Sequence, residues 1–299
     1  MRIAEALATQ RPFFSFEFFP PKDEVGSRRL FETIEALVPL RPAFVSITYG
    51  AGGSTRTRTV ELAKQIQNEI GLTVMAHATC MGATRAELRD LFDELARAGV
   101  QNVLALRGDP PKDGTPALAP GGFAHADELI AMIASAYDFS IGAACHPEKH
   151  LEAPSMNADI ENCKRKVDAG AEFLVSQLFF DNDAFFAFVE RARQAGIGVP
   201  ILPGVMPITN YEQIERFTAM CGASIPAKLR VELDARRGDL VAVENLGVAY
   251  ASMQSIDLLR RGAPGIHFYT LNKSPATRAI VSSLLASSAW QPVTATHLD

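Results

Sequence analysis

The sequence predicts an α/β fold: a single (β/α)8 barrel of the TIM type, with extra helices inserted before the eighth strand. Its 299 residues are enough for one such barrel. Short apolar runs alternate with longer amphipathic runs, which implies parallel strands joined by right-handed crossovers. The alternation occurs eight times. Eight units favour a closed barrel over an open sheet.

Eight apolar runs, each close to the usual strand length, are the predicted strands. They cover residues 13–18, 44–48, 73–78, 102–106, 140–144, 173–178, 200–205 and 265–269. Amphipathic runs predict helices over 27–37, 57–70, 84–98, 124–137, 158–169, 182–195, 211–220 and 274–285. Thr84 and Glu87 have the spacing of a capping box, and Gly99, Gly170 and Gly196 follow expected helix ends.

Residues 226–261 interrupt the alternation and predict two more helices within the same domain. No shift in composition and no Pro/Gly/Ser linker marks a second domain. We therefore expect one domain over residues 1–299, with the barrel core at about 12–285 and a tail at 286–299.

Composition and charge exclude several classes of protein. Hydrophobic residues make up 47% of the chain, which excludes a mainly disordered protein, and the net charge of −5 disfavours nucleic-acid binding. The four cysteines form no CxxC pair, so we expect neither a zinc knuckle nor a disulfide framework. No run reaches the roughly 18 apolar residues of a membrane span, and no secretory signal opens the chain. We expect a cytoplasmic protein.

The barrel interpretation places the functional site before any motif is named, because active sites of this fold lie at the carboxyl ends of the strands. The polar residues expected there are Glu17, Thr48, His77, Arg107 with Asp109, His146 and Gln177.

Glu17 belongs to an aromatic strand. Alternation turns Phe14, Phe16 and Phe18 to one face, and Ser15 and Glu17 to the other. Burial among aromatic rings should raise the pKa of the carboxyl and make it a general acid near neutral pH. The alternative is a structural ion pair with a buried Arg or Lys.

Two further patterns have both a functional and an ordinary interpretation. Arg107, Gly108 and Asp109 end the fourth strand, where the glycine could admit a ligand close to the backbone, or the tripeptide could be chance. Asp159, Asn162, Arg165 and Lys166 form a helical stripe that could hold a diphosphate or could face solvent.

Several other motifs are missing or incomplete. The glycine-rich residues 50–55 lack the lysine of a P-loop and predict a loop, and no G-x-G-x-x-G follows a strand. His146 and His150 flank a proline, so we expect no metal site there. There is no G-x-S-x-G to anchor a serine nucleophile.

Eight segments in order carry a family resemblance: FEFFPP (16–21), SITYG (46–50), HATC (77–80), LALRGD (104–109), KRKVDAGA (164–171), QLFFD (177–181), PGVMP (203–207) and HFYTLN (267–272). Over about residues 12–285 the chain resembles the methylenetetrahydrofolate reductase family of the bacterial, flavin-dependent type. The larger eukaryotic members carry a regulatory domain after the barrel, for which we expect no room here.

The resemblance implies an oxidoreductase of one-carbon metabolism and methionine biosynthesis, with non-covalent FAD. NAD(P)H would reduce the flavin and leave, and 5,10-methylenetetrahydrofolate would then take a hydride in the same pocket to give 5-methyltetrahydrofolate. Glu17 matches the general acid that protonates N10 and opens the ring to an iminium cation. Asp109 matches the residue that contacts the pterin and tunes the flavin, and its charge would favour that cation.

The resemblance also implies two sets of contacts. The cofactor-binding set is Thr48, His77, Leu106, Arg107, Gly108, Asp109, Phe123, Ala144, His146, His150, Asp159, Asn162, Arg165 and Lys166. The substrate-binding set is Glu17, Asp109, Gln177, Gln213, Phe217, Tyr269 and Lys273. His146 and Phe123 each stand where the enteric enzymes would carry a tyrosine.

Two other functions stay open at this point. One is a flavin-free reductase of the same barrel that passes hydride directly from nicotinamide to folate, against which the helical stripe argues. The other is a non-catalytic pterin- or flavin-binding subunit, against which Glu17 and Asp109 argue. We expect a homo-oligomer, small-molecule substrates, and no nucleic acid, membrane or metal; NADH is preferred to NADPH by resemblance alone.

Overall fold

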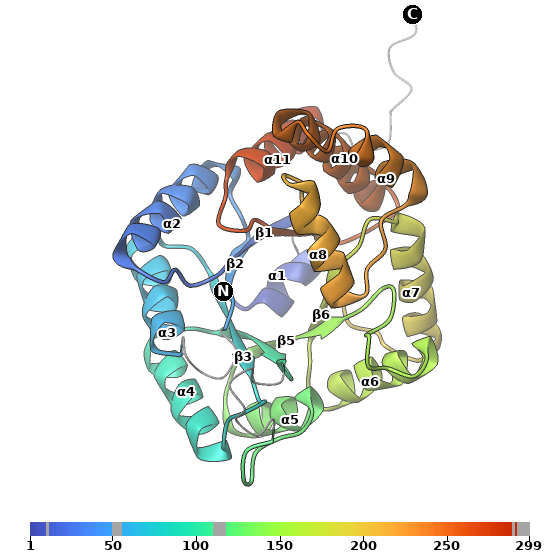
Figure 1. The fold of residues 1–299 in the computed structure, drawn as a ribbon. Helices are drawn as coiled ribbons and strands as arrows, with labels where there is room; N and C mark the ends of the chain where they lie inside the picture. Colours follow the sequence, from blue (N-terminus) through green and yellow to red (C-terminus); the bar gives the residue numbers. More distant parts are fainter. Residues whose placement is uncertain (10–11, 50–55, 110–117, 289–290, 292–299) are drawn as a thin grey trace, which may run out of the picture.

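Eight parallel strands pair in chain order and close into a barrel, as the sequence predicts (Figure 1). The computed structural model describes residues 1–9, 12–49, 56–109, 118–288 and 291. The strands are β1 (Phe13–Phe18), β2 (Phe44–Ile47), β3 (Val74–Thr79), β4 (Asn102–Leu106), β5 (Ser140–Cys145), β6 (Phe173–Leu178), β7 (Ile201–Val205) and β8 (Gly265–Tyr269). Their ends differ from the predicted ends by at most one residue.

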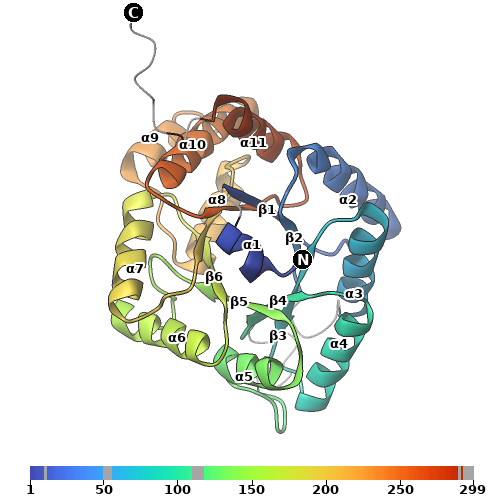
Figure 2. The same cartoon turned by 180° about the vertical axis from the view of Figure 1, so that it is seen from behind.

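After β1 the helices are α2 (Glu24–Leu37), α3 (Arg56–Gln65), α4 (Arg85–Arg97), α5 (Ala126–Ala136), α6 (Met156–Asp168), α7 (Asn182–Gln194), α8 (Tyr211–Cys221), α9 (Ala227–Asp234), α10 (Leu240–Arg260) and α11 (Pro275–Ser287). Most of them form a ring around the barrel and pack their apolar faces on its outer surface (Figures 1 and 2). Helix α8 lies inside that ring in Figure 1 and packs with α9 in a separate apolar cluster. The capping box of Thr84 and Glu87 is present. The two helices expected within 226–261 are α9 and α10, which precede β8.

Two predicted helices differ from the structure in ways that local chemistry explains. The helix expected over 57–70 ends as an α-helix at Gln65 and continues as a π-helical turn, Ile66–Ile70, before the left-handed Gly71. Helix α2 begins three residues earlier than expected because the side chain of Asp23 accepts a hydrogen bond from Gly26 N at 2.7 Å. The short helical turn Val38–Leu40 that follows α2 was not predicted.

A short helix at the start of the chain, α1 (Ile3–Thr9), was also not predicted. It lies across the amino-terminal ends of the strands, at the centre of the barrel in Figure 2. Ile3 and Leu7 are buried against residues that fill the lower barrel interior. The backbone N–H of Ile3 donates to Asn102 Oδ1 at 2.8 Å, and that of Ala4 donates to Ser140 Oγ at 3.2 Å. These contacts tie α1 to the first residues of β4 and β5.

Side chains fill the barrel in layers that become polar toward the carboxyl ends of the strands. Phe44, Met75 and Phe173 belong to the apolar lower layer. Ser15 and His267 lie above them and are fully buried. On β1 the predicted alternation is confirmed, because Phe16 packs outward against the helices while Ser15 and Glu17 point inward. In the ranges described, every helix is too short or too polar to cross a bilayer.

Candidate active site

Two adjoining cavities open at the carboxyl ends of the strands, and each is large enough for a cofactor-sized ligand. The first has a volume of about 500 Å³ and lies against α5 and α6. The second has a volume of about 480 Å³ and reaches Glu17 and α8. Both are lined by Leu106, Arg107, Asp109, Ala144, His146, His150, Glu152 and Gln177. The shared residues make the two cavities one continuous space.

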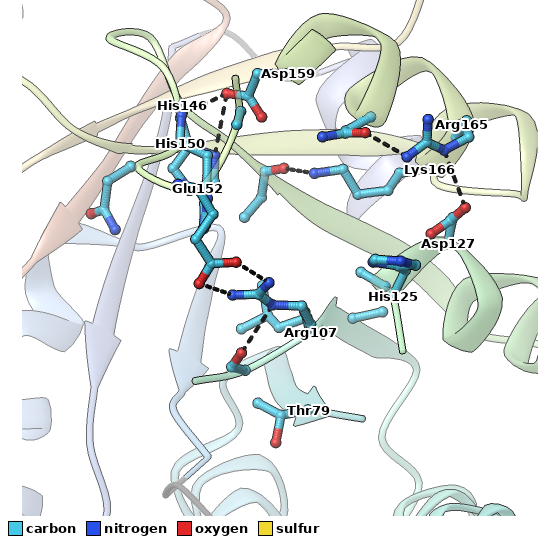
Figure 3. A pocket seen from close by; sticks show the side chains of 18 of the residues that line it. Thr79, Arg107, His125, Asp127, His146, His150, Glu152, Asp159, Arg165 and Lys166 are labelled. Atoms are coloured by element: carbon cyan, nitrogen blue, oxygen red, sulfur yellow. Dashed lines mark hydrogen bonds and ion pairs between the residues drawn. The ribbon is translucent and has the colours of Figure 1, made fainter. Parts of the chain in front are cut away.

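Helix α6 supplies the polar wall of the first cavity (Figure 3). Ser155 caps the helix, and Asp159, Asn162, Arg165 and Lys166 all line the cavity, as the helical stripe predicts. Lys166 Nζ donates to the carbonyl of Ala144 at 2.5 Å. Arg165 donates to Asn162 Oδ1 at 2.5 Å and pairs with Asp127 on α5 at 3.5 Å. The stripe therefore faces a cavity, with its two cations held by defined partners.

Arg107 stands between the two cavities at the end of β4. Its guanidinium makes a bidentate ion pair with Glu152, in which Nη2 and Oε1 are 2.9 Å apart (Figure 3). The hydrogen bond with Glu152 raises the pKa of Arg107, and the same bond lowers the pKa of Glu152. The next residue, Gly108, has a φ of +85°, which side-chain-bearing residues adopt at a cost.

The loop after β5 brings two histidine rings to the cavity wall. The rings of His146 and His150 meet edge to face with centroids 4.7 Å apart. The backbone N–H of His150 donates to Asp159 Oδ2 at 2.8 Å, which ties the loop to α6. Burial and the charge of Lys166 lower the pKa of His146 to about 3, so its imidazole is neutral at pH 7. Within the described residues His146 Nδ1 has no hydrogen-bond partner.

Glu17 lies in the second cavity at the end of β1, where its carboxylate faces polar side chains from three other strands. His77 Nε2 on β3 and His267 Nε2 on β8 each lie 3.4 Å from Glu17 Oε2. The hydroxyl of Ser46 on β2 donates to the same oxygen over 3.4 Å. Partners of this kind favour the charged form of a carboxyl group.

These partners decide the direction in which the pKa of Glu17 moves. Burial raises the pKa, but the hydrogen bond with His267 and the interactions with His77 and Ser46 outweigh burial, so the pKa lies below its ordinary value of 4.5. The prediction of a raised pKa is therefore wrong for the protein alone. It took the aromatic rings of β1 as the surroundings of the carboxyl, but those rings face the helices.

Most of the predicted site residues line this continuous space. Besides the residues already named, Thr48, His77, Phe217 and Tyr269 line the second cavity, and Gly108 lines the first. The hydroxyl of Tyr269 donates to the carbonyl of Ser176 at 2.6 Å. Phe217 lies on α8, which covers one side of the second cavity.

Three predicted residues lie outside the two cavities. Phe123 is buried beneath the guanidinium of Arg85, which lies 4.6 Å from its ring centroid. Gln213 is half-buried in the first turn of α8. Lys273 is exposed and lines a neighbouring cavity of about 710 Å³ that shares Tyr269 with the second cavity. The glycine-rich loop at 50–55 and residues 110–117 lie outside the described residues.

Sequence reasoning missed three residues that now matter. Glu152 pairs with Arg107, and Asp127 pairs with Arg165, but each partner comes from a distant segment. His267 touches Glu17 from the eighth strand. Its position two residues before Tyr269, on the same face of the strand, was the available signal.

Comparisons with known proteins identify the family. The family model described as methylenetetrahydrofolate reductase matches residues 2–285. The chain is 38% identical over 271 residues to 5,10-methylenetetrahydrofolate reductase of Escherichia coli K12, with 90% of each chain covered. It is 41% identical to methylenetetrahydrofolate reductase (NADH) 1 of Arabidopsis thaliana, over 91% of this chain and 48% of that protein. The chain thus spans about half the length of the plant relatives it matches.

Solved structures share the architecture at low sequence identity. A protein from Clostridium thermocellum that binds two copies of 5-methyl-5,6,7,8-tetrahydrofolic acid aligns with a TM-score of 0.67 and 15% identity, over 96% of this chain and 99% of that chain. At that identity the likeness shows the barrel fold alone. The family match and the Escherichia coli relative go further: this chain belongs to the methylenetetrahydrofolate reductase family.

Proposed function

We propose that this protein reduces 5,10-methylenetetrahydrofolate to 5-methyltetrahydrofolate, with NADH as electron donor and non-covalently bound FAD as hydride carrier. The observation that carries the proposal is the continuous cavity, which joins a wall that carries Arg165 and Lys166 to the carboxylate of Glu17. Membership of the family supports the substrate and the reaction. The plant relatives named for NADH support that donor over NADPH.

The residues of the first cavity fit a flavin dinucleotide. Arg107, Arg165 and Lys166 supply positive charge for a diphosphate on one wall. His146 Nδ1 is buried and has no hydrogen-bond partner within the described residues, although Asp159 Oδ2 lies 3.8 Å away, so this nitrogen is available to hydrogen-bond a ligand. FAD, when bound, would carry hydride between the nicotinamide and the folate. The protein would supply binding, orientation and electrostatics.

The second cavity supplies the residues that act on the folate. Glu17 would give a proton to N10, so that the bond from N10 to the bridging carbon breaks and an iminium cation forms at N5. Asp109 lines the same space and would stabilise the positive charge that develops there. The pterin and the nicotinamide would bind one after the other against Gln177, Phe217 and Tyr269.

The proposal also includes self-association. Val231 on α9 and Leu240, Val241 and Met253 on α10 are exposed apolar side chains on the inserted helices. Their exposure supports a homo-oligomer in which these helices meet a second copy. Light scattering on the purified protein would report a multiple of the 32.4 kDa of one chain.

The experiment that tests the reaction uses the absorbance of the purified protein. Anaerobic NADH should bleach a flavin band, and 5,10-methylenetetrahydrofolate should then restore it. A colourless protein that reduces the folate without added FAD would support direct hydride transfer instead. Folate binding without turnover by either nicotinamide would support a non-catalytic subunit.

Substitution of Glu17 separates the two half-reactions. Glu17→Gln should still bind FAD and oxidise NADH, because the residue is needed only for the proton given to the folate. Its rate of folate reduction should fall by a factor of about 10²–10⁴. Glu35→Gln, at an exposed position on α2, is the matched control and should leave both rates unchanged. Folate reduction at the wild-type rate in Glu17→Gln would rule out Glu17 as the acid.

A further inference from the structure

A general acid must carry a proton at neutral pH, yet the surroundings of Glu17 favour its ionised form. The source of the proton is therefore a question that the proposed function raises and does not answer. The candidates are the groups that face the carboxyl: His77 on β3, Ser46 on β2, and His267 and Tyr269 on β8. Of these, the two histidines take up and release protons most readily near pH 7.

His267 lies directly beneath Glu17, in a layer that strand pairing creates. In the register of β1 and β8, Ser15 stands opposite His267 and Glu17 stands opposite Tyr269. His267 is fully buried, and its ring stacks on Phe44 with centroids 5.7 Å apart. The edge of Tyr269 meets the other side of the layer, 5.4 Å from the ring of His267. The packing holds the imidazole in one orientation.

Both ring nitrogens of His267 have polar partners in that orientation. Nδ1 lies 2.8 Å from the hydroxyl of Ser15, and Nε2 lies 3.4 Å from Glu17 Oε2. Ser46 Oγ lies 3.5 Å from the same Nε2. Because Ser15 can accept a hydrogen bond from Nδ1–H, the other nitrogen is free to exchange its proton with the carboxylate. Catalytic hydrogen bonds of this length often shorten when the substrate binds.

His77 does not have this arrangement, although it lies at the same distance from the carboxylate. It lines the second cavity, and its Nε2 makes no hydrogen bond within the described residues. Burial lowers the pKa of His77 to about 4, so its imidazole is neutral at pH 7 and has no acidic proton to give. His267 lies behind Glu17, outside the residues that line the two cavities.

Two arrangements of one proton are possible for the Glu17–His267 pair. One is a carboxylate beside an imidazolium, which water in the cavity would stabilise because water solvates charge. A neutral carboxylic acid beside a neutral imidazole is favoured when ligands exclude that water, since burial disfavours charge. The total charge of the pair is the same in both arrangements, so the exchange needs no proton from solvent.

We propose that Glu17 and His267 share one proton, which passes from His267 Nε2 to Glu17 Oε2 when a bound folate excludes water from the cavity. The N–H bond at Nε2 breaks as the O–H bond at Glu17 forms. The acid then gives that proton to N10 of the folate, whose bond to the bridging carbon breaks with its electron pair remaining on N10. Solvent returns a proton to the pair after the product leaves. The proposal rests on the proposed function, and His267 acts in it through Glu17 as a positioning and proton-holding residue.

Measurement of the protonation state of Glu17, together with the number of protons taken up on binding, tests the exchange without turnover. The FAD-loaded protein is labelled with ¹³C at the glutamate carboxyls, and the Glu17 signal is identified by its loss in Glu17→Gln. Addition of 5-methyltetrahydrofolate at pH 7.5 should move that signal to the protonated form. Calorimetry in buffers of different ionisation enthalpy should find almost no proton uptake. Uptake of about one proton by the wild-type protein, or a Glu17 signal that stays ionised, would overturn the proposal.

The variant His267→Gln tests the same idea by kinetics. Its amide can still donate to Glu17 but cannot store a proton. We expect reoxidation of the reduced enzyme by 5,10-methylenetetrahydrofolate to slow by a factor of about 10–100 at pH 7.5 and to recover toward acidic pH. Reduction of the enzyme by NADH should keep its wild-type rate. Phe44→Leu is the matched control, because it disturbs the packing on His267 and should leave the pH dependence unmoved.

The outcomes separate this inference from the proposed function. If the reduced wild-type enzyme is not reoxidised by the folate, the proposed function fails. If it is reoxidised and His267→Gln keeps the wild-type pH profile, only the shared proton fails. If His267→Gln does not fold, the ¹³C signal of Glu17 and the proton uptake of the wild-type protein still decide the question.

Discussion

At the scale of single residues, the position of Gly108, just after β4, leaves no room for a side chain. Its φ is +85°, and a Cβ placed on it would lie 2.8 Å from Thr79 Cβ. Gly108→Ala should therefore lose stability for two reasons. The left-handed backbone costs about 1–2 kcal/mol, and the new Cβ would clash with Thr79 beside the first cavity. Urea unfolding measures the loss of stability, and flavin fluorescence measures the expected weakening of FAD binding.

Gly121→Ala is the matched control for that variant. Gly121 has a similar φ of +68° but nothing within 4 Å of the place where its Cβ would lie. It should lose only the backbone part of the stability and keep the affinity for FAD. Equal losses in the two variants would mean that contact with Thr79 contributes nothing.

The residue scale is also where sequence reasoning reached its limit. The inward position of Glu17 followed from alternation along one strand. The neighbours that set its charge, His77 and His267, come from strands whose register with β1 no local pattern reveals. Glu152 reaches Arg107 across 45 residues, and such a pair leaves no periodic signal. Local patterns thus indicated which residues point into the site but not which residues face one another.

At the scale of elements, the inserted helix α10 packs tightly on the loop that follows β7. A Cβ on Gly247 would lie 1.8 Å from the carbonyl oxygen of Ile208. Alanine in a helix interior usually stabilises by about 0.5–1 kcal/mol relative to glycine. Here we expect Gly247→Ala to destabilise by about 1–3 kcal/mol, because the helix must move away from the loop.

Urea unfolding checks this prediction. Glu35→Ala, at an exposed position on α2, is the control and should change the free energy of unfolding by less than about 0.5 kcal/mol. A stabilised Gly247→Ala would show that the approach of α10 to Ile208 is not a constraint.

Elements that belong to the repeating strand–helix pattern could be predicted, and the isolated helix α1 could not. The eight strands and the helices between them repeat an apolar pattern that is strong in each segment, so their number and order followed from the sequence. Helix α1 has seven residues, which is too short to be stable by itself. Contacts with Asn102 and Ser140 stabilise it, and these contacts exist only in the folded barrel.

At the scale of the whole molecule, two buried histidines make stability depend on pH. Burial lowers the pKa of His77 to about 4 and that of His146 to about 3, against an ordinary value of 6.5. Between pH 6.5 and 4 the unfolded chain binds protons at these positions that the folded chain does not. Stability should therefore be fully present above pH 6.5 and fall as the pH drops below it, by at most about 1.4 kcal/mol per pH unit for each histidine.

The slope of unfolding free energy against pH, measured with urea at pH 7.5, 6 and 5, checks this expectation. His146→Phe keeps a planar ring but cannot take up a proton, so its slope should be shallower than that of the wild type. The carboxyl of Glu152, whose pKa is lowered by Arg107, loses its contribution only below pH 4.5 and does not enter this window. An unchanged slope in His146→Phe would contradict a neutral, buried His146.

Helix α1 limits the side of the barrel from which ligands can enter and leave. It lies across the amino-terminal ends of the strands, so the cavities are reached from the opposite end of the barrel (Figure 2). A nicotinamide and a folate that both use this space must arrive and depart on the same side. Under the proposed function each would obstruct the other while bound, so the two substrates would alternate because of the shape of the barrel as well as its chemistry.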